Sequence, residues 1–286
     1  VVYLHREDVA TRYMALVRRN QSKARVLYSV ADLHFLRLAR QAAIQGRPEL
    51  MAKANQARIA EYRAALQADA VLTHSQTEAA QLRKDLPQAN VHIVPWAVSQ
   101  TTSKATNRTG VLFVGNYAHA PNGDAARWLV QDIMPAVWAM DPTITCTLVG
   151  AEMPDSIHAM ASDRVRVLGH VQDLGSVLGQ ARLSVAPLRF GAGIKGKVLE
   201  SLSAGVPCIM TPVAAEGLTL PKNLQPLVQT TADDLARQIV ALHTAEDLSD
   251  VVNAGRAYTQ AMFSEEAVMA ALNSALDQKA ALRAAG

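Results

Sequence analysis

Residues 191–200, GAGIKGKVLE, combine the residue types of an anion-binding loop. Gly191 and Gly193 let the backbone approach a ligand closely, because glycine has no Cβ and adopts φ angles that other residues avoid. Lys195 and Lys197 add positive charge directly before a predicted helix. The unpaired N–H groups and the positive dipole end of a helix N-terminus favour a phosphate. The stretch therefore predicts a phosphate site, with a purely structural turn as the alternative.

Glu200 follows the lysines on the same predicted helix, about one turn further along. Its carboxylate can accept two hydroxyl hydrogen bonds, which is what the diol of a ribose offers. A ribose beside a phosphate is part of a nucleotide, so the stretch as a whole indicates a nucleotide site. The alternative for Glu200 is an acid that is favoured near a helix N-terminus by the dipole alone.

Two common nucleotide motifs do not explain this stretch. The P-loop requires Ser or Thr directly after its lysine, and Val198 follows Lys197 here. The letters GAGIKG satisfy the dinucleotide pattern GxGxxG, but they lie late in the predicted domain. No acid follows at the usual distance after a second strand, so the match to that pattern is weak.

The rest of the chain alternates between strand-like and helix-like segments, which is typical of parallel α/β sheets. Ser75 or Thr77 is the expected N-cap of one helix, and Asp173 of another. Strands are expected at 1–5, 25–30, 70–74, 91–94, 111–114, 145–149, 165–168, 183–186 and 207–211. Helices are expected at 9–19, 36–66 with an interruption at 46–48, 75–84, 125–140, 173–180, 197–204, 233–243 and 264–285.

A polar stretch without periodicity, residues 95–110, divides the chain. We therefore expect a first Rossmann-like domain at 1–100, a linker at 101–110, a second domain at 111–263 and a C-terminal helix at 264–286. Because the chain opens directly on a strand, the first domain is expected to be incomplete at its start.

In such sheets, ligands bind beyond the carboxyl ends of the strands. Glycine occurs in most of the loops that follow the predicted strands of the second domain, where it would let a ligand lie close to the backbone. The alternative for each glycine is a tight strand-to-helix turn. These loops hold Gly115-Asn116, Gly150, Gly169-His170-Val171, residues 188–197 and residues 212–217.

Composition and charge narrow the function classes. The chain is 50% hydrophobic and 19% charged, which excludes a disordered protein. Its net charge of +3 is too small for a nucleic-acid binder, so we expect no nucleic-acid partner. The apolar runs are too short to span a membrane, and Cys146 and Cys208 lie in apolar runs, as buried thiols of a cytoplasmic protein do. A slight basic excess in residues 1–60 allows peripheral contact with the inner face of the cell membrane.

Several of these segments resemble the group 1 (family 4) glycosyltransferases. The likeness is strongest in residues 111–137, 165–188 and 186–218, which resemble the donor-binding domain. Residues 25–42, 68–82 and 91–99 are similar to the acceptor domain and the interdomain linker of that family. The resemblance implies the GT-B fold, with two Rossmann-like domains, and a hexosyltransferase-type reaction that retains the anomeric configuration.

The resemblance also implies roles for individual residues. Lys195 and Lys197 would neutralise the departing diphosphate, and His34 would reach the donor sugar; we take these three as the catalytic candidates. Glu200 would hold the ribose. The other predicted donor-binding residues are Gly115, Asn116, His119, Asn122, His170, Val171, Arg189, Gly191, Gly193, Ile194 and Glu216, of which His170 and Val171 would line the base and Arg189 would assist the lysines.

The chain departs from the family at one position. The family commonly has two glutamates eight residues apart, and the first of them falls on Ala192. We expect a nucleotide-diphosphate sugar of the UDP or GDP type as substrate. No DxD motif or acidic cluster occurs at metal-binding spacing, so neither a metal nor a cofactor is predicted.

The sequence thus predicts sugar transfer to a glycan or lipid-linked acceptor, in cell-surface polysaccharide or lipopolysaccharide assembly. Two alternatives stay open. An NDP-sugar 2-epimerase would need acid and base carboxylates in the first domain, where Glu7, Asp8, Asp32 and Glu61 are available. A nucleotide-binding fragment without turnover is the other alternative.

Overall fold

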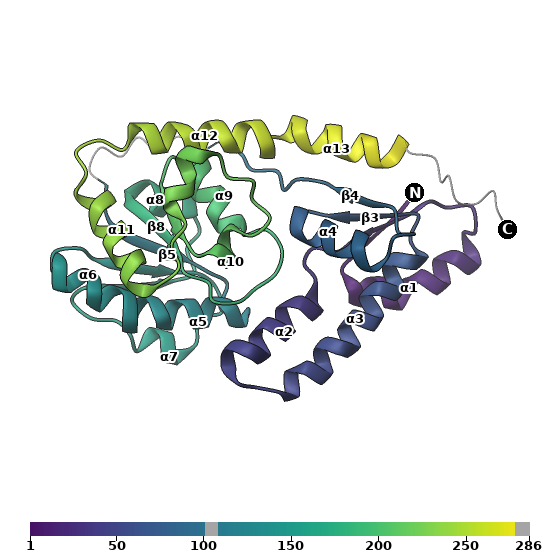
Figure 1. Cartoon of the computed structure of the whole chain (residues 1–286), viewed down its shortest axis with the longest axis horizontal. Helices are drawn as coiled ribbons and strands as arrows, with labels where there is room; N and C mark the ends of the chain where they lie inside the picture. Colours follow the sequence, from purple (N-terminus) through teal and green to yellow (C-terminus); the bar gives the residue numbers. More distant parts are fainter. Residues whose placement is uncertain (101–107, 278–286) are drawn as a thin grey trace.

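A computed structural model describes residues 1–100 and 108–277 of the chain (Figure 1). These residues form two α/β domains, each built on a wholly parallel sheet. The predicted linker falls largely on residues 101–107, which lie outside the described residues. The predicted α/β class with parallel sheets is confirmed.

The first domain has a 4-stranded sheet in the order β1-β2-β3-β4. Its central strands β2 and β3 are buried along their whole length, which explains why they read as continuous apolar runs. The strands are β1 (Val2–His5), β2 (Val26–Ser29), β3 (Ala70–Thr73) and β4 (Val91–Ile93), and the helices are α1 (Glu7–Asn20), α2 (His34–Gln45), α3 (Glu49–Gln67) and α4 (Gln76–Asp85).

The long helical stretch predicted at 36–66 is divided into α2 and α3, as the interruption at 46–48 indicated. Gly46 ends α2 in the left-handed conformation (φ 61°), a common C-terminal signal. The stretch begins two residues earlier than predicted, at His34. In Figure 1, α2 lies on the side of the first domain that faces the second.

The second domain has a 5-stranded sheet in the order β7-β6-β5-β8-β9. The chain order reverses between the neighbours β5 and β8, and ligands of open α/β sheets bind at such a reversal. The loops that follow these two strands therefore form the natural ligand site. The strands are β5 (Thr109–Val114), β6 (Cys146–Val149), β7 (Val165–Gly169), β8 (Ala181–Ala186) and β9 (Cys208–Met210).

Helices pack around this second sheet and bury its strands (Figure 1). The predicted N-caps Ser75 and Asp173 are both confirmed, at α4 and α8. The helix predicted at 125–140 contains a π-helical turn just before Pro135, a residue that cannot donate a regular helical hydrogen bond. The elements are α5 (Ala120–Trp128), η1 (Leu129–Ile133), α6 (Met134–Met140), α7 (Asp155–His158), α8 (Leu174–Gln180), α9 (Gly196–Ser203), α10 (Pro212–Ala215), η2 (Lys222–Leu227) and α11 (Ala232–Thr244).

The last two helices join the domains (Figure 1). Helix α12 (Ser249–Phe263) packs on α9, and α13 (Glu265–Asp277) packs on the first sheet, where Val268 and Leu272 contact its apolar cluster. No helix was predicted between residues 243 and 264, so α12 is a correction. Gly255 obscured the pattern, since glycine is a poor helix former. A glycine suits this position in the helix, because a Cβ there would lie only 3.1 Å from the Leu202 side chain.

Candidate active site

A cavity of about 880 Å³ lies between the two domains and is lined by residues of both. Its volume falls in the ordinary range of ligand pockets. The strand-end loops after β5 and β8 form one wall, as the reversal of strand order requires. Most of the predicted site residues line this cavity: His34, Gly115, Asn116, His119, Asn122, Gly191, Ile194, Lys195, Lys197 and Glu200.

The loop between β8 and α9 brings the predicted phosphate residues to the cavity. Lys195 is the N-cap of α9, and among the described residues no side chain caps this helix end. Gly193 has a φ of +69°, and a Cβ placed there would lie 3.0 Å from the Cβ of Asp32 in the first domain. A glycine is therefore required where the loop meets the opposite domain.

Lys197 is held between the two strand-end loops. Its Nζ donates a hydrogen bond of 2.6 Å to Asn122 Oδ1 and lies 4.4 Å from the centre of the Phe113 ring. Burial lowers the pKa of its ammonium to about 7, and the neighbouring charge of Lys195 acts in the same direction. An anion in the cavity would favour the charged form of this lysine.

Lys195 is buried and folded back on its own loop. Its Nζ donates to the carbonyl of Ala192 over 3.0 Å and also to the carbonyl of Gly193. Burial lowers the pKa of this ammonium to about 8, whereas the carboxylates of Glu216 and Glu78 oppose the shift. An ammonium has three donors, so one stays available to a ligand.

Glu200 lies on α9, exposed on the same cavity wall as Lys197. Partial burial raises the pKa of its carboxyl, and the charge of Lys197 counteracts this. The indole of Trp96, which follows β4 in the first domain, lies 3.6 Å from the position of a Cβ on Gly196. The carboxylate and the indole thus border the same part of the cavity.

The loop after β5 is shaped by two asparagines. Asn122 donates through its side-chain nitrogen to the carbonyl of Asn116 over 2.6 Å, and Asn116 accepts from the backbone N–H of Ala118. A side chain on Gly115 would lie 2.9 Å from Asn122, so the glycine allows this close packing. His119 is the N-cap residue of α5.

His34 faces the cavity from the first domain. Its Nε2 lies 3.7 Å from Asp32 Oδ1, and the other carboxylate oxygen of Asp32 accepts from Arg37 Nε over 3.1 Å. Burial lowers the pKa of the imidazole, although Asp32 opposes the shift. The ring is therefore largely neutral near pH 7, since the ordinary pKa is already 6.5.

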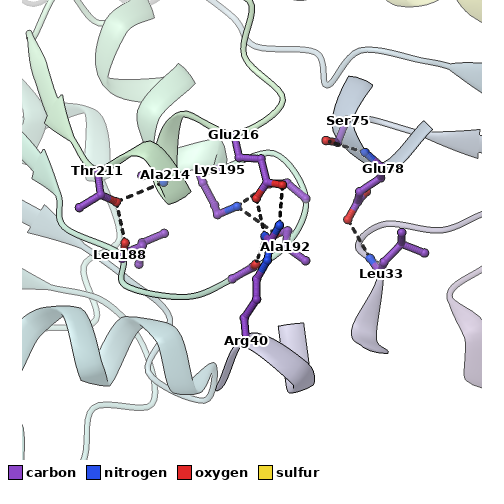
Figure 2. Close-up of polar contacts among 12 residues, drawn as sticks. Leu33, Arg40, Ser75, Glu78, Leu188, Ala192, Lys195, Thr211, Ala214 and Glu216 are labelled. Atoms are coloured by element: carbon purple, nitrogen blue, oxygen red, sulfur yellow. Dashed lines mark hydrogen bonds and ion pairs between the residues drawn. The ribbon is translucent and has the colours of Figure 1, made fainter. Parts of the chain in front are cut away.

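Two buried carboxylates hold the N-terminus of α2, and through it His34. Glu61 accepts from the backbone N–H groups of His34 (2.7 Å) and Phe35 (3.2 Å). Glu78 accepts from the N–H of Leu33 (2.8 Å; Figure 2) and from the hydroxyl of Thr73. Burial raises the pKa of Glu61 to about 7 and raises that of Glu78 as well. The epimerase alternative requires an acid and a base carboxylate in the first domain. Of its four candidates, Asp32 lines the cavity, whereas Glu61 accepts hydrogen bonds from the N-terminus of α2.

Five predicted residues do not line the cavity. Arg189 makes two hydrogen bonds, of 2.8 and 2.6 Å, to the carboxylate of Asp124. Glu216 is paired with Arg40, and Gly193 is covered by the first domain. His170 and Val171 follow β7, an edge strand two places away from the reversal. In this structure, Arg189 and Glu216 thus form ion pairs within the protein.

Other residues of the site were not predicted as donor contacts, and Asp32 was named only as an acid for the epimerase alternative. Asp32, Arg37 and Trp96 line the cavity, and Arg40 joins the two domains beside it. A signal for the arginines was present, because His34, Arg37 and Arg40 recur every three residues after a strand and so share one face of α2. Trp96 carried no such signal, since it lies in the aperiodic stretch that divides the chain.

Comparison with known proteins finds a family that the second domain resembles. Residues 108–245 match the model of the family described as glycosyl transferases group 1. No curated protein matches the chain by sequence. Among the described residues, no helix is both long and apolar enough to cross a membrane.

Solved structures match both domains together, at low sequence identity. Sucrose-phosphate synthase from Thermosynechococcus elongatus has a TM-score of 0.75 at 18% identity, and the match covers 96% of this chain and 72% of that one. Anabaena HepE in complex with UDP and glucose has a TM-score of 0.72 at 13% identity, over 96% of this chain and 77% of that one.

A further match is a mutant of S. aureus TarM in complex with fondaparinux, alpha-GlcNAc-glycerol and UDP. Its TM-score is 0.72 at 12% identity, and the match covers 90% of this chain and 52% of that one. The chain therefore spans about half the length of TarM. These structures show that the chain has the GT-B fold, and its residues 108–245 are similar to the group 1 glycosyl transferases.

Proposed function

We propose that the chain transfers a sugar from a nucleoside-diphosphate donor to a glycan or lipid-linked acceptor, with retention of configuration. The observation that carries this proposal is the position of Lys197 and Glu200 on one cavity wall, at the N-terminus of α9. A diphosphate would meet the lysine and the helix end, and its ribose would meet the carboxylate. UDP bound to TarM and HepE supports this class of donor.

Lys195 and Lys197 would stabilise the negative charge that develops on the diphosphate as the sugar departs. Their pKa values, about 8 and about 7, are lowered by burial, so both respond strongly to an anion in the cavity. Because two ammonium groups and a helix dipole already face this position, we propose that transfer needs neither a metal nor a cofactor.

The first domain would receive the acceptor and the sugar. His34 faces the donor wall from across the cavity and is largely neutral, so it can both donate and accept a hydrogen bond to sugar hydroxyls. The glycan ligands of the TarM structure support a glycan acceptor. Resemblance to the group 1 enzymes supports retention and a place in cell-surface polysaccharide or lipopolysaccharide assembly, at the cytoplasmic side of the cell membrane.

The proposal is tested by thermal unfolding of the protein with UDP, GDP and the sugar forms of each. We expect one of the two series to raise the melting temperature, and incubation with that sugar donor and a glycan to yield product with the donor's anomeric configuration. If none of these nucleotides shifts the melting temperature, the assignment of this cavity as the donor site is wrong. If a donor binds but is neither hydrolysed nor transferred, the chain is a nucleotide-binding module instead.

A further inference from the structure

Arg40 reaches from the first domain to two loops of the second (Figure 2). It lies on α2, and its guanidinium binds both carboxylate oxygens of Glu216, one of them over 2.8 Å. The same guanidinium donates to the carbonyl of Gly191 over 2.7 Å. Gly191 lies in the loop between β8 and α9, residues 187–195, which we call the phosphate loop, and Glu216 directly follows α10. One side chain therefore holds both loops to the first domain.

Glu216 lies near Lys195, because Arg40 binds both Glu216 and the carbonyl of Gly191, and a Cβ on Gly191 would lie 3.7 Å from Lys195 Nζ. Of the charged groups that act on this lysine, Glu216 raises its pKa most, followed by Glu78; Asp32 acts in the same direction and Arg40 in the opposite one. A carboxylate that paired directly with Lys195 would compete with any diphosphate for its ammonium.

Arg40 occupies the Glu216 carboxylate in this structure. A planar guanidinium binds a carboxylate through two parallel hydrogen bonds, which occupy both oxygens of Glu216. The Glu216 side chain is mostly buried, which strengthens the pair. Lys195 meanwhile donates to the neutral carbonyls of Ala192 and Gly193, which an incoming phosphate can replace as acceptors.

We propose that Arg40 is a positioning residue for the donor diphosphate, because it occupies the Glu216 carboxylate and so keeps Lys195 available to the phosphates. The inference rests on the proposed function, since it concerns the same donor site. It differs from a simple clasp between the domains in one respect. If Arg40 only held the domains together, loss of Arg40 or of Glu216 would weaken UDP binding equally. Under the proposal, UDP binding is weakened by a Glu216 carboxylate that no longer binds Arg40.

The first test is calorimetric titration of UDP into wild type, Arg40→Ala and Arg40→Ala/Glu216→Gln. Arg40→Ala should weaken UDP binding about fivefold or more, the usual lower range for coupling between two sites. The double variant should bind UDP more tightly than Arg40→Ala, because it no longer has the competing carboxylate. If the double variant binds UDP as weakly as Arg40→Ala, Arg40 only holds the domains together, and the proposal is overturned.

The second test needs no nucleotide. The pH midpoint for acylation of Lys195, followed by peptide mass spectrometry, reports the pKa of its ammonium, which is about 8 in the wild type. The midpoint should rise in Arg40→Ala and fall below the wild-type value in the double variant, because Glu216 affects Lys195 more than Arg40 does. Identical midpoints in the three proteins would contradict the proposal.

Arg237→Ala is the matched control, because it removes an arginine from an exposed ion pair with Asp234 on α11. It should change neither UDP affinity nor the Lys195 midpoint. Thermal unfolding of each variant checks that it is folded. A wild-type protein that binds no UDP contradicts the proposed function, whereas identical midpoints in proteins that bind UDP contradict the inference alone.

Discussion

Lys197 Nζ and Asn122 Oδ1 lie 2.6 Å apart, and this hydrogen bond joins the elements that follow β8 and β5. It crosses the point where strand order reverses, so it places the ammonium at the expected ligand position. The amide oxygen is neutral, as is the Phe113 ring nearby. These neutral partners compensate poorly for burial, which outweighs the nearby charge of Glu200, and the pKa of the lysine is therefore about 7.

We predict that UDP binding takes up protons. In the free protein the pKa values of Lys197 and Lys195 are about 7 and about 8, and a bound diphosphate favours the charged form of each. Both pKa values therefore rise on binding. Above about pH 7, the lower of the two free-state pKa values, binding should consume protons, and UDP affinity should fall as pH rises.

Titration calorimetry in buffers with different ionisation heats measures this proton uptake directly. Lys197→Met should bind UDP more weakly and take up fewer protons over the same pH range. Binding that is independent of pH, with no proton exchange, would mean that these ammonium groups do not contact the phosphates.

Glu200→Ala separates the ribose role of this residue from a general electrostatic role. A hydrogen bond to a charged acceptor contributes about 1.5–3 kcal/mol, so the variant should bind UDP about tenfold or more weakly. Pyrophosphate has no ribose, and its affinity should not fall. Competition titrations give both affinities; an equal loss for both ligands would contradict the ribose assignment.

Much of the site follows from the sequence because it depends on local features. The strands of the second sheet are apolar and followed by glycine loops, so their carboxyl ends could be located along the chain. The residues that then face the cavity, such as Lys197 and Glu200, lie within one turn of such a loop. The local sequence pattern is sufficient to predict that residues of this kind face the cavity.

Pairs formed across the fold were not predictable in the same way. Arg189 is bound by Asp124, which lies 65 residues away, and Glu216 by Arg40, 176 residues away. Nothing near Arg189 or Glu216 in sequence marks these partners, so both residues were assigned to a ligand. Glu61 was recognised as an available acid, but its helix-capping contacts depend on the packing of α3 beside α2.

Glu61→Ala should lower the free energy of unfolding by about 2–6 kcal/mol, because an unsatisfied buried donor costs about 1–3 kcal/mol and two N–H groups lose their acceptor. Glu61→Gln keeps one acceptor oxygen and should lose less. Urea denaturation measures both values. Equal losses in the two variants would mean that the single amide oxygen of glutamine does not replace the carboxylate as an acceptor.

The pH dependence of stability gives a second measure of Glu61. Its pKa is 4.5 ordinarily and about 7 in the folded protein, so the folded state binds the proton more tightly. Between these two values, wild-type stability should therefore fall as pH rises. Glu61→Gln does not titrate, so its stability should fall less over the same range.

Removal of divalent metal tests the prediction that the lysines and the helix N-terminus suffice to stabilise the negative charge of the diphosphate. We expect UDP affinity to be the same with EDTA and with added magnesium, within the error of calorimetry. Transfer should respond in the same way once a donor and acceptor are known. A large loss of UDP affinity in EDTA would show that a cation shares the charge with Lys195 and Lys197.

Gly193→Ala tests the contact between the phosphate loop and the first domain, with Gly46→Ala as its control. Both glycines have positive φ angles, +69° and +61°, so both substitutions should lose roughly 1 kcal/mol of stability to backbone strain. A Cβ at residue 46 meets nothing within 4 Å, whereas one at residue 193 lies 3.0 Å from Asp32. Gly193→Ala should therefore weaken UDP binding as well, because the loop must move away from the first domain. If the two variants lose the same stability and both keep wild-type UDP affinity, this contact does not shape the donor site.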